Sequence, residues 1–257
     1  MPEFPNMDMA VHSAMNEQLE AIVLSLTDYR ENDAVIHVLT AEKGKMALIG
    51  TGVRKVSSKN GRNIQPCTHC SILYDHKENR SMQRIRTVSS LHLFRHMKED
   101  LKASIAGSLL CEAVQSLLEE GEPCQEIYDS LLKAFLYLDE GKHVDTTVCA
   151  FLSQMLNDLG FGLQVDGCAI CNDTKVTSFS IGDGGFLCQH HMLAHRTSIW
   201  DPLDLKRFRL INKAGMKHFD ILSESTQATS RDVMELVGVV RMHTGAPLRS
   251  YDLYKKI

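Results

Sequence analysis

The sequence predicts an α+β protein, in which a small N-terminal β-barrel is followed by an α-helical domain with an embedded zinc-binding module. Five short apolar, β-branched runs come first, with no long helix between them, which is typical of a small barrel. Beyond Ser89 the apolar residues recur at helical spacing. Within this helical part, two pairs of metal-binding residue types lie sixteen residues apart. We therefore expect a lead-in at 1–16, the barrel at 17–88, helices at 89–164, the metal module at 165–195 and the rest of the helical domain at 196–257.

The barrel strands are expected where β-branched and apolar residues cluster between turn residues. These runs lie at 21–26, 34–40, 46–51, 70–74 and 84–88. Before them, Pro2 and Pro5 stand in a segment with little periodicity. This composition predicts that residues 1–16 are flexible.

The helices are expected where apolar residues fall three or four positions apart between glycine and proline stop signals. A long helix is predicted from about Leu91 to Leu117. A second runs from Pro123 to Gly141, and a third from about Thr146 to Gly160. After the metal module, helical texture returns near Pro202, at 230–243 and at 247–257.

Metal-ligand spacing is found in the stretch Cys168-Ala-Ile-Cys171 and Cys188-Gln-His-His191. Two residues between the members of each pair let one tight turn present both ligands to one metal. The segment between the pairs has two strand-like runs around a glycine turn at 182–185, which predicts a hairpin that brings the pairs together. Thiolate and imidazole ligands at this spacing favour tetrahedral Zn²⁺. Four protein ligands leave no open position, so this zinc is expected to be structural.

Other interpretations of this stretch remain open. His190 or His195 could replace His191 as the fourth ligand. A redox Cys-x-x-Cys is less favoured, because it would need neither the second pair nor the hairpin.

A second cysteine pair raises a catalytic alternative. Cys67 and Cys70 follow a proline, which matches half of a nucleobase deaminase zinc site. The other half, His-x-Glu, should come earlier in the chain. The only such sequence, His76-x-Glu78, follows the cysteines too closely for a helix to intervene. We therefore interpret the two cysteines as strand residues, or as a weak metal site together with His69.

The composition limits the function classes. A hydrophobic fraction of 44% with 23% charged residues is ordinary for a globular protein, and the net charge of −4 means that any nucleic-acid surface must arise from local clustering. No apolar run approaches the length of a membrane span, and the N-terminus lacks the pattern of a secretory signal. The remaining cysteines are scattered, which fits reduced thiols in a cytoplasm. Phosphate-loop, nucleophile-elbow and His-Glu-x-x-His motifs are absent, so we expect no enzyme.

Positive charge concentrates in one part of the predicted barrel. No acidic residue occurs between Lys43 and Tyr74. We expect phosphate contacts first from Arg54, Lys55, Lys59 and Arg62, and next from Lys43, Lys45, Arg84 and Arg86. Because Tyr29 and Tyr74 are essentially the only aromatic residues available for stacking in this half, binding should depend steeply on salt. The alternative is a solvated loop whose charge maintains solubility.

Several short motifs, in a fixed order, resemble those of a known family. They are Tyr29-x-Glu31-x-Asp33, Leu39-Thr40-x-Glu42-x-Gly44, Gly52-x-Arg54-Lys55-x-x-Ser58-Lys59, Gln65-Pro66, Cys168-x-x-Cys171, Gly184-Gly185-x-Leu187-Cys188 and His243-x-Gly245-x-Pro247-Leu248-x-Ser250. Together they cover essentially Gln18 to Ile257 and resemble the bacterial recombination mediator family RecO. His191 stands where many members of that family have a fourth cysteine.

The resemblance implies that the barrel is an OB-fold and that the protein is not an enzyme. It also implies binding to single- and double-stranded DNA, annealing of complementary strands without ATP, and a cytoplasmic, nucleoid-associated location in a bacterium. The implied protein partners are RecR and the acidic C-terminal tail of single-stranded-DNA-binding protein, with RecA helped indirectly onto gapped DNA. Acidic residues crowd the first two predicted helices, so DNA contact should be confined to the barrel side; they are Glu112, Glu119, Glu120, Glu122 and Glu126. The alternative is a protein-interaction scaffold that binds little DNA.

Overall fold

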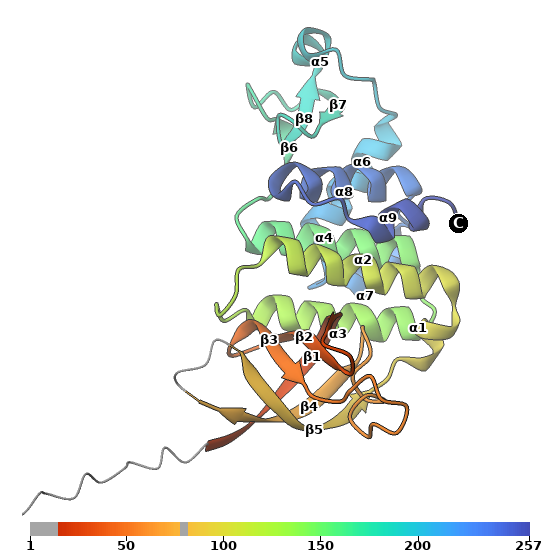
Figure 1. The fold of residues 1–257 in the computed structure, drawn as a ribbon. Coiled ribbons are helices and arrows are strands. Elements are labelled where there is room, and N and C mark those ends of the chain that lie inside the picture. Colours follow the sequence, from red (N-terminus) through yellow and green to blue (C-terminus); the bar gives the residue numbers. More distant parts are fainter. Residues whose placement is uncertain (1–14, 78–81) are drawn as a thin grey trace, which may run out of the picture.

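The computed structural model describes residues 15–77 and 82–257 and shows an elongated molecule (Figure 1). The barrel lies at one end, the helices are stacked in the middle, and a small sheet with one short helix lies at the far end. The mixed α+β class, with a sheet followed by helices, is therefore confirmed. The predicted flexible lead-in falls outside the described residues except at its end, where Met15 and Asn16 begin the first strand.

The barrel is closed, with the strand order β1-β2-β3-β5-β4. Its strands overlap all five predicted runs: β1 Met15–Tyr29, β2 Asp33–Thr40, β3 Gly44–Gly50, β4 His69–His76 and β5 Gln83–His92. Neighbouring strands are antiparallel except β3 and β5, which are parallel. Alternate residues point inward, so that Ile36, Val38, Leu48 and Ile72 have no exposed surface.

The first helical segment differs from its prediction, because the long helix expected from Leu91 to Leu117 is interrupted. Strand β5 continues to His92, and Phe94 then adopts a left-handed conformation with φ of 48° as its ring packs edge-on against Phe135. A short helix, α1 (Arg95–Glu99), ends at the extended residue Asp100. The Asp100 side chain accepts a hydrogen bond from the Ala103 backbone N–H at 2.7 Å and so starts α2 (Leu101–Leu117).

The remaining helices form one body around a shared hydrophobic core. Helices α3 (Gln125–Asp139) and α4 (Val144–Asp158) precede the small sheet, and α6 (Pro202–Ala214), α7 (Phe219–Ser225), α8 (Ser230–Thr244) and α9 (Arg249–Tyr254) follow it. The buried Asp232 carboxylate at the start of α8 accepts a hydrogen bond from Arg207 Nε of α6 at 2.7 Å. Residues 101–158 and 202–254 are therefore packed together, although the metal module separates them in the sequence.

The barrel is attached to the helical body through backbone groups in very close contact. The turn between β2 and β3 lies against the loop that follows α2, where the Gly121 N–H donates to the Lys45 carbonyl at 3.0 Å and the Cys124 N–H donates to the Ala41 carbonyl at 3.1 Å. Gly44 has a φ of 61°, and a Cβ at this position would lie 1.8 Å from the carbonyl oxygen of Glu122. Only glycine fits there, because both the backbone conformation and the available space exclude a side chain.

The fold predicts that Gly44→Ala is far more destabilising than Gly121→Ala. Both glycines have a positive φ and lie at the same contact, but nothing lies within 4 Å of a Cβ at Gly121. Gly121→Ala should therefore cost only the backbone strain of about 1–2 kcal/mol. Gly44→Ala adds a backbone clash and should lower the free energy of unfolding by more than about 3 kcal/mol, beyond the usual range for one substitution. Urea unfolding of both variants measures the difference, and equal losses would contradict the tight contact.

Candidate metal cluster and basic loop

The four predicted metal ligands lie together at the far end of the molecule. The possible ligand atoms of Cys168, Cys171, Cys188 and His191 all lie within 4.8 Å of one another. Cys171 Sγ is 3.8 Å from Cys188 Sγ, and His191 Nδ1 is 3.4 Å from Cys168 Sγ and 3.3 Å from Cys188 Sγ. The cluster could hold a metal ion.

The spacing of these atoms can be compared with that of a tetrahedral site. For metal–sulfur bonds of about 2.3 Å and a metal–nitrogen bond of about 2.0–2.1 Å, tetrahedral geometry separates two sulfurs by about 3.8 Å and sulfur from nitrogen by about 3.6 Å. The three measured separations are within about 0.3 Å of these values. These three separations therefore match one tetrahedral ion, and the other ligand atoms lie within 4.8 Å of one another.

Local backbone structure brings the ligands together. The predicted hairpin is present as β7 (Val176–Ser180) and β8 (Gly185–Cys188), and a strand that the sequence did not predict, β6 (Gln164–Cys168), pairs in parallel with β8. A tight turn follows β6, in which the Asn172 N–H donates to the Cys168 carbonyl at 2.8 Å. Burial raises the pKa of Cys168, but hydrogen bonds from the backbone N–H groups of Cys188, Cys171 and Ile170 outweigh burial and lower this pKa to about 6. A thiolate at Cys168 suits metal binding.

The alternative fourth ligands lie elsewhere. His190 is exposed and does not belong to the cluster, while His195 Nδ1 lies 2.9 Å from Asp183 Oδ2. All three histidines belong to the short helix α5 (Gln189–His195), which the sequence did not predict. His191 lies three residues after Cys188, which is close to one helical turn, so its side chain faces the same side as that thiol.

The module has little hydrophobic core of its own. Its buried apolar cluster consists of Cys168, Leu187 and Cys188, with only two partly buried neighbours. On its other side the hairpin packs against the helical body, where the Phe179 ring lies 4.9 Å from that of Phe208 in α6 and 5.5 Å from that of Trp200. Few apolar residues surround the cluster, so hydrophobic packing stabilises this part of the module only weakly. A bound metal would supply further stability.

The other cysteine pair does not converge on one site. Cys67 Sγ lies 3.6 Å from Cys111 Sγ of α2 in the helical core, whereas Cys70 Sγ faces the Ala21 carbonyl within the barrel. His69 Nε2 lies 2.9 Å from the Tyr128 hydroxyl of α3. The weak metal site suggested by these three residues is therefore not present in the structure.

The segment 51–63, here called the basic loop, connects β3 to the chain leading into β4 and lies at the barrel end of the molecule (Figure 1). Its side chains Arg54, Lys55, Lys59 and Arg62 are all exposed. Arg84 and Arg86 are exposed on β5, two residues apart and therefore on one face of the strand. Asn60 joins the two parts, since its side chain donates to the Arg86 carbonyl at 2.9 Å and accepts from the Val88 N–H at 3.1 Å.

The eight predicted DNA-binding residues differ in how their charge is used. Within the described residues, Lys55, Lys59, Arg62 and Arg84 take part in no ion pair, whereas Arg54 pairs with Asp28 at 2.5 Å and Arg86 with Asp75 at 2.5 Å.

Lys43 and Lys45 are half-buried and bonded within the protein. Lys43 pairs with Glu17 and donates to the Tyr74 hydroxyl at 2.7 Å. Hydrogen bonds from Lys43 and Tyr74 hold the pKa of Glu17 below its usual value. Lys45 donates to the carbonyls of Gln115 and Leu118 at the end of α2. Tyr74 itself is fully buried, so the suggestion that it could stack on bases is wrong.

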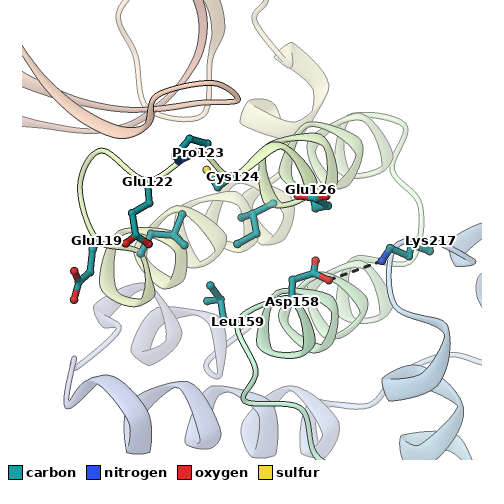
Figure 2. Close-up of a pocket in the computed structure, with 10 residues that line it drawn as sticks. Glu119, Glu122, Pro123, Cys124, Glu126, Asp158, Leu159 and Lys217 are labelled. Atoms are coloured by element: carbon teal, nitrogen blue, oxygen red, sulfur yellow. Dashed lines mark ion pairs between the residues drawn. The ribbon is translucent and has the colours of Figure 1, made fainter.

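An acidic pocket lies on the helical body beside the barrel (Figure 2). Glu119, Glu122, Glu126 and Asp158 line it, and the only cation among its lining residues is Lys217, 3.8 Å from Asp158. A phosphate backbone would be repelled here. Glu112, another acid of this region, instead accepts hydrogen bonds from the backbone and side chain of Ser250, both at 3.0 Å.

The sequence interpretation missed the residues that fix the basic loop in place. Asp33 accepts a hydrogen bond from the Gly52 N–H at 2.7 Å, and Asn63 donates to the Val88 carbonyl at 2.9 Å. A signal was available in the asparagine and aspartate of these turns, which often bond to nearby backbone. Their partners are distant in sequence, so the contacts could not be predicted.

Taken together, the closed barrel with its cationic loop, the helical body and the distal Cys/His cluster define a barrel-and-bundle protein with a candidate metal site. A family model described as "Recombination protein O N terminal" matches residues 15–94, and one described as "Recombination protein O C terminal" matches residues 98–251. The chain therefore belongs to the RecO family.

Individual relatives agree with this assignment. A protein named DNA repair protein RecO from Syntrophomonas wolfei is 29% identical over 172 residues, which cover 66% of this chain and 67% of that protein. Proteins of the same name from Rhodopirellula baltica and Exiguobacterium sibiricum are each 26% identical, over 73% and 69% of this chain and 72% and 71% of theirs. In the described part of the chain, no helix is long and apolar enough to cross a membrane.

If the cluster holds a metal, Cys171→Ser should release it and destabilise the fold. Cys171 is exposed, so the substitution removes little packing, and the loss of about 3 kcal/mol or more that we expect would report the metal. Elemental mass spectrometry and thermal unfolding provide the measurements. His190→Ala, adjacent to the cluster but outside it, is the matched control. An unchanged melting temperature for Cys171→Ser, with no metal in the wild type, would refute the site.

Proposed function

We propose that this protein acts in DNA repair as a non-enzymatic recombination mediator, which binds single- and double-stranded DNA and anneals complementary strands. Family membership supports the repair role. The observation that carries DNA binding is a group of exposed cations on the basic loop and adjoining strand that form no ion pair with any residue of 15–77 or 82–257: Lys55, Lys59, Arg62 and Arg84. One such surface can neutralise two phosphate backbones at once, so complementary strands can approach and pair without ATP.

The barrel is proposed to be an OB-fold. The closed strand order β1-β2-β3-β5-β4 supports this assignment, because OB-folds are five-stranded Greek-key barrels that bind oligonucleotides with their strands and loops. Arg54 and Arg86 would join the phosphate contacts once DNA competes for their acidic partners. Lys43 and Lys45 are proposed to contribute mainly through the local potential, because their amines are bonded within the protein.

The metal is proposed to be Zn²⁺ with a structural role. Three thiolates and one imidazole form a closed tetrahedral set without a position for substrate, which is the arrangement of structural zinc sites. The site lies at the end of the molecule opposite the barrel, as Figure 1 shows for β6, β7, β8 and α5. Its proposed contribution is to the fold of the module and not to DNA contact.

The proposed partners follow from the family resemblance. RecR, the acidic tail of single-stranded-DNA-binding protein and, indirectly, RecA would act with this protein in a bacterial cytoplasm, close to the nucleoid. The acidic pocket is a poor docking site for an acidic tail, because like charges would meet there. A scaffold that binds proteins and little DNA is the second candidate, and the acidic face of the helical body favours it.

Neutralising the four cationic side chains proposed to carry DNA binding should weaken that binding and reduce its salt dependence. In the variant with glutamine at Lys55, Lys59, Arg62 and Arg84, the slope of log affinity against log salt for single strands should fall by about 0.7 for each phosphate that the protein no longer neutralises. Fluorescence anisotropy over a salt series measures this slope. A control with glutamine at the exposed residues Lys175, Lys206, Arg249 and Lys256 removes the same charge from the helical and metal-module regions and should change the slope little. Equal slopes for both variants would contradict the assignment.

Annealing tests the mediator function itself. The wild type should speed the pairing of two complementary labelled oligonucleotides without nucleotide, and the four-glutamine variant should lose this effect. Little binding to DNA even at low salt, together with no acceleration of pairing, would instead favour a scaffold.

A further inference from the structure

Val56 lies at the tip of the basic loop and is 98% exposed, the largest value among the large apolar residues that the structure describes. Single exposed apolar residues are common and need no explanation on their own. This one is distinguished by its position, because it follows Arg54 and Lys55 directly and precedes Lys59 by three residues. An aliphatic group therefore stands among the cations that are proposed to hold phosphates.

The loop that carries Val56 is held in one shape. At its neck, Gly61 approaches Val53 so closely that a Cβ would lie 2.2 Å from the Val53 carbonyl oxygen. Val53 and Ile64, on either side of the neck, are buried in the barrel core. Within the tip, the Ser58 N–H donates to the Lys55 carbonyl at 2.9 Å. The exposure of Val56 is thus a property of an ordered loop that is anchored at both ends.

A second apolar group lies at the end of β1, beside the turn between β1 and β2. This turn is joined to the loop by the ion pair of Arg54 with Asp28 and by a hydrogen bond from the Arg54 N–H to the Asn32 carbonyl at 3.1 Å. Tyr29 follows Asp28 directly, is 36% exposed, and carries the Arg30 guanidinium 5.1 Å from its ring centroid. The two connected turns therefore present a valine, a tyrosine and several cations.

We propose that Val56, together with Tyr29, contacts the bases of single-stranded DNA while the neighbouring cations hold its phosphates. The inference rests on the proposed DNA binding and adds a base contact to it. Base faces are apolar and, in a single strand, free to pack against side chains, whereas in a duplex they are stacked on one another. Apolar side chains also enter between the bases of duplex DNA, but there a base step must first be unstacked, which a flexible single strand does not require. The proposed site would hold single strands whose bases are unpaired, as they are just before two strands anneal.

Two single-stranded oligonucleotides distinguish contact with the bases from contact with the phosphates. One is oligothymidine, and the other has the same length and charge but abasic sugars. Val56→Ser should weaken binding to oligothymidine roughly fourfold or more, the effect expected when about one buried methyl group no longer packs on a base. It should leave binding to the abasic strand and the salt slope unchanged, because no charge is removed. Tyr29→Ser should behave in the same way.

Two controls complete the design. Val56→Ile keeps an apolar branched side chain and should retain wild-type affinity, while Leu203→Ser removes an exposed apolar residue of α6 (73% exposed) and should have no effect. If Val56→Ser weakened binding to both oligonucleotides equally, or to neither, the proposed base contact would be overturned. The DNA-binding proposal would remain intact. Absence of DNA binding by the wild type at low salt would overturn both.

Discussion

The structure depends on the close approach of two backbone segments where the barrel meets the helices. Gly44 leaves no space for a side chain beside the Glu122 carbonyl, and two inter-segment hydrogen bonds of 3.0 and 3.1 Å flank this contact. Lys45 strengthens it, because its ammonium group binds carbonyls at the C-terminal end of α2, where the helix dipole favours a cation. One of the cations that the sequence offers for DNA therefore orients the barrel on the helical body.

This orientation explains how a protein with a net charge of −4 can offer a basic surface. Strand β3 begins at the acidic loop after α2 and ends at the basic loop, and its length of seven residues separates the two by about 20 Å. That distance exceeds the Debye length of about 8 Å at physiological salt, so the acidic pocket is largely screened from a phosphate at the basic loop. The metal module lies farther away still, beyond the helices (Figure 1).

Local patterns in the sequence predicted much of this arrangement. The five strands were predicted because short apolar, β-branched runs lie between turn residues, and the four clustered ligands because Cys-x-x-Cys and Cys-x-x-His place both members on one turn. Features set by tertiary contacts could not be predicted: β5 continues to His92 and Phe94 packs against Phe135 where the long helix was expected, and α5 and α7 are too short to show a helical period. Lys43 and Lys59 carry the same charge in the sequence, but only Lys43 is bonded to a buried tyrosine. This difference could not be predicted, because a cation's partners are known only from the fold.

We propose that DNA meets the barrel at the basic loop and not at the helical body. Hydrogen exchange with mass spectrometry, with and without saturating oligothymidine at low salt, locates the contact most directly. DNA should slow exchange in peptides covering residues 51–63 and 83–88 and should leave peptides covering 118–127 unchanged. Protection of 118–127 with the basic loop unchanged would place DNA on the acidic side and contradict the account.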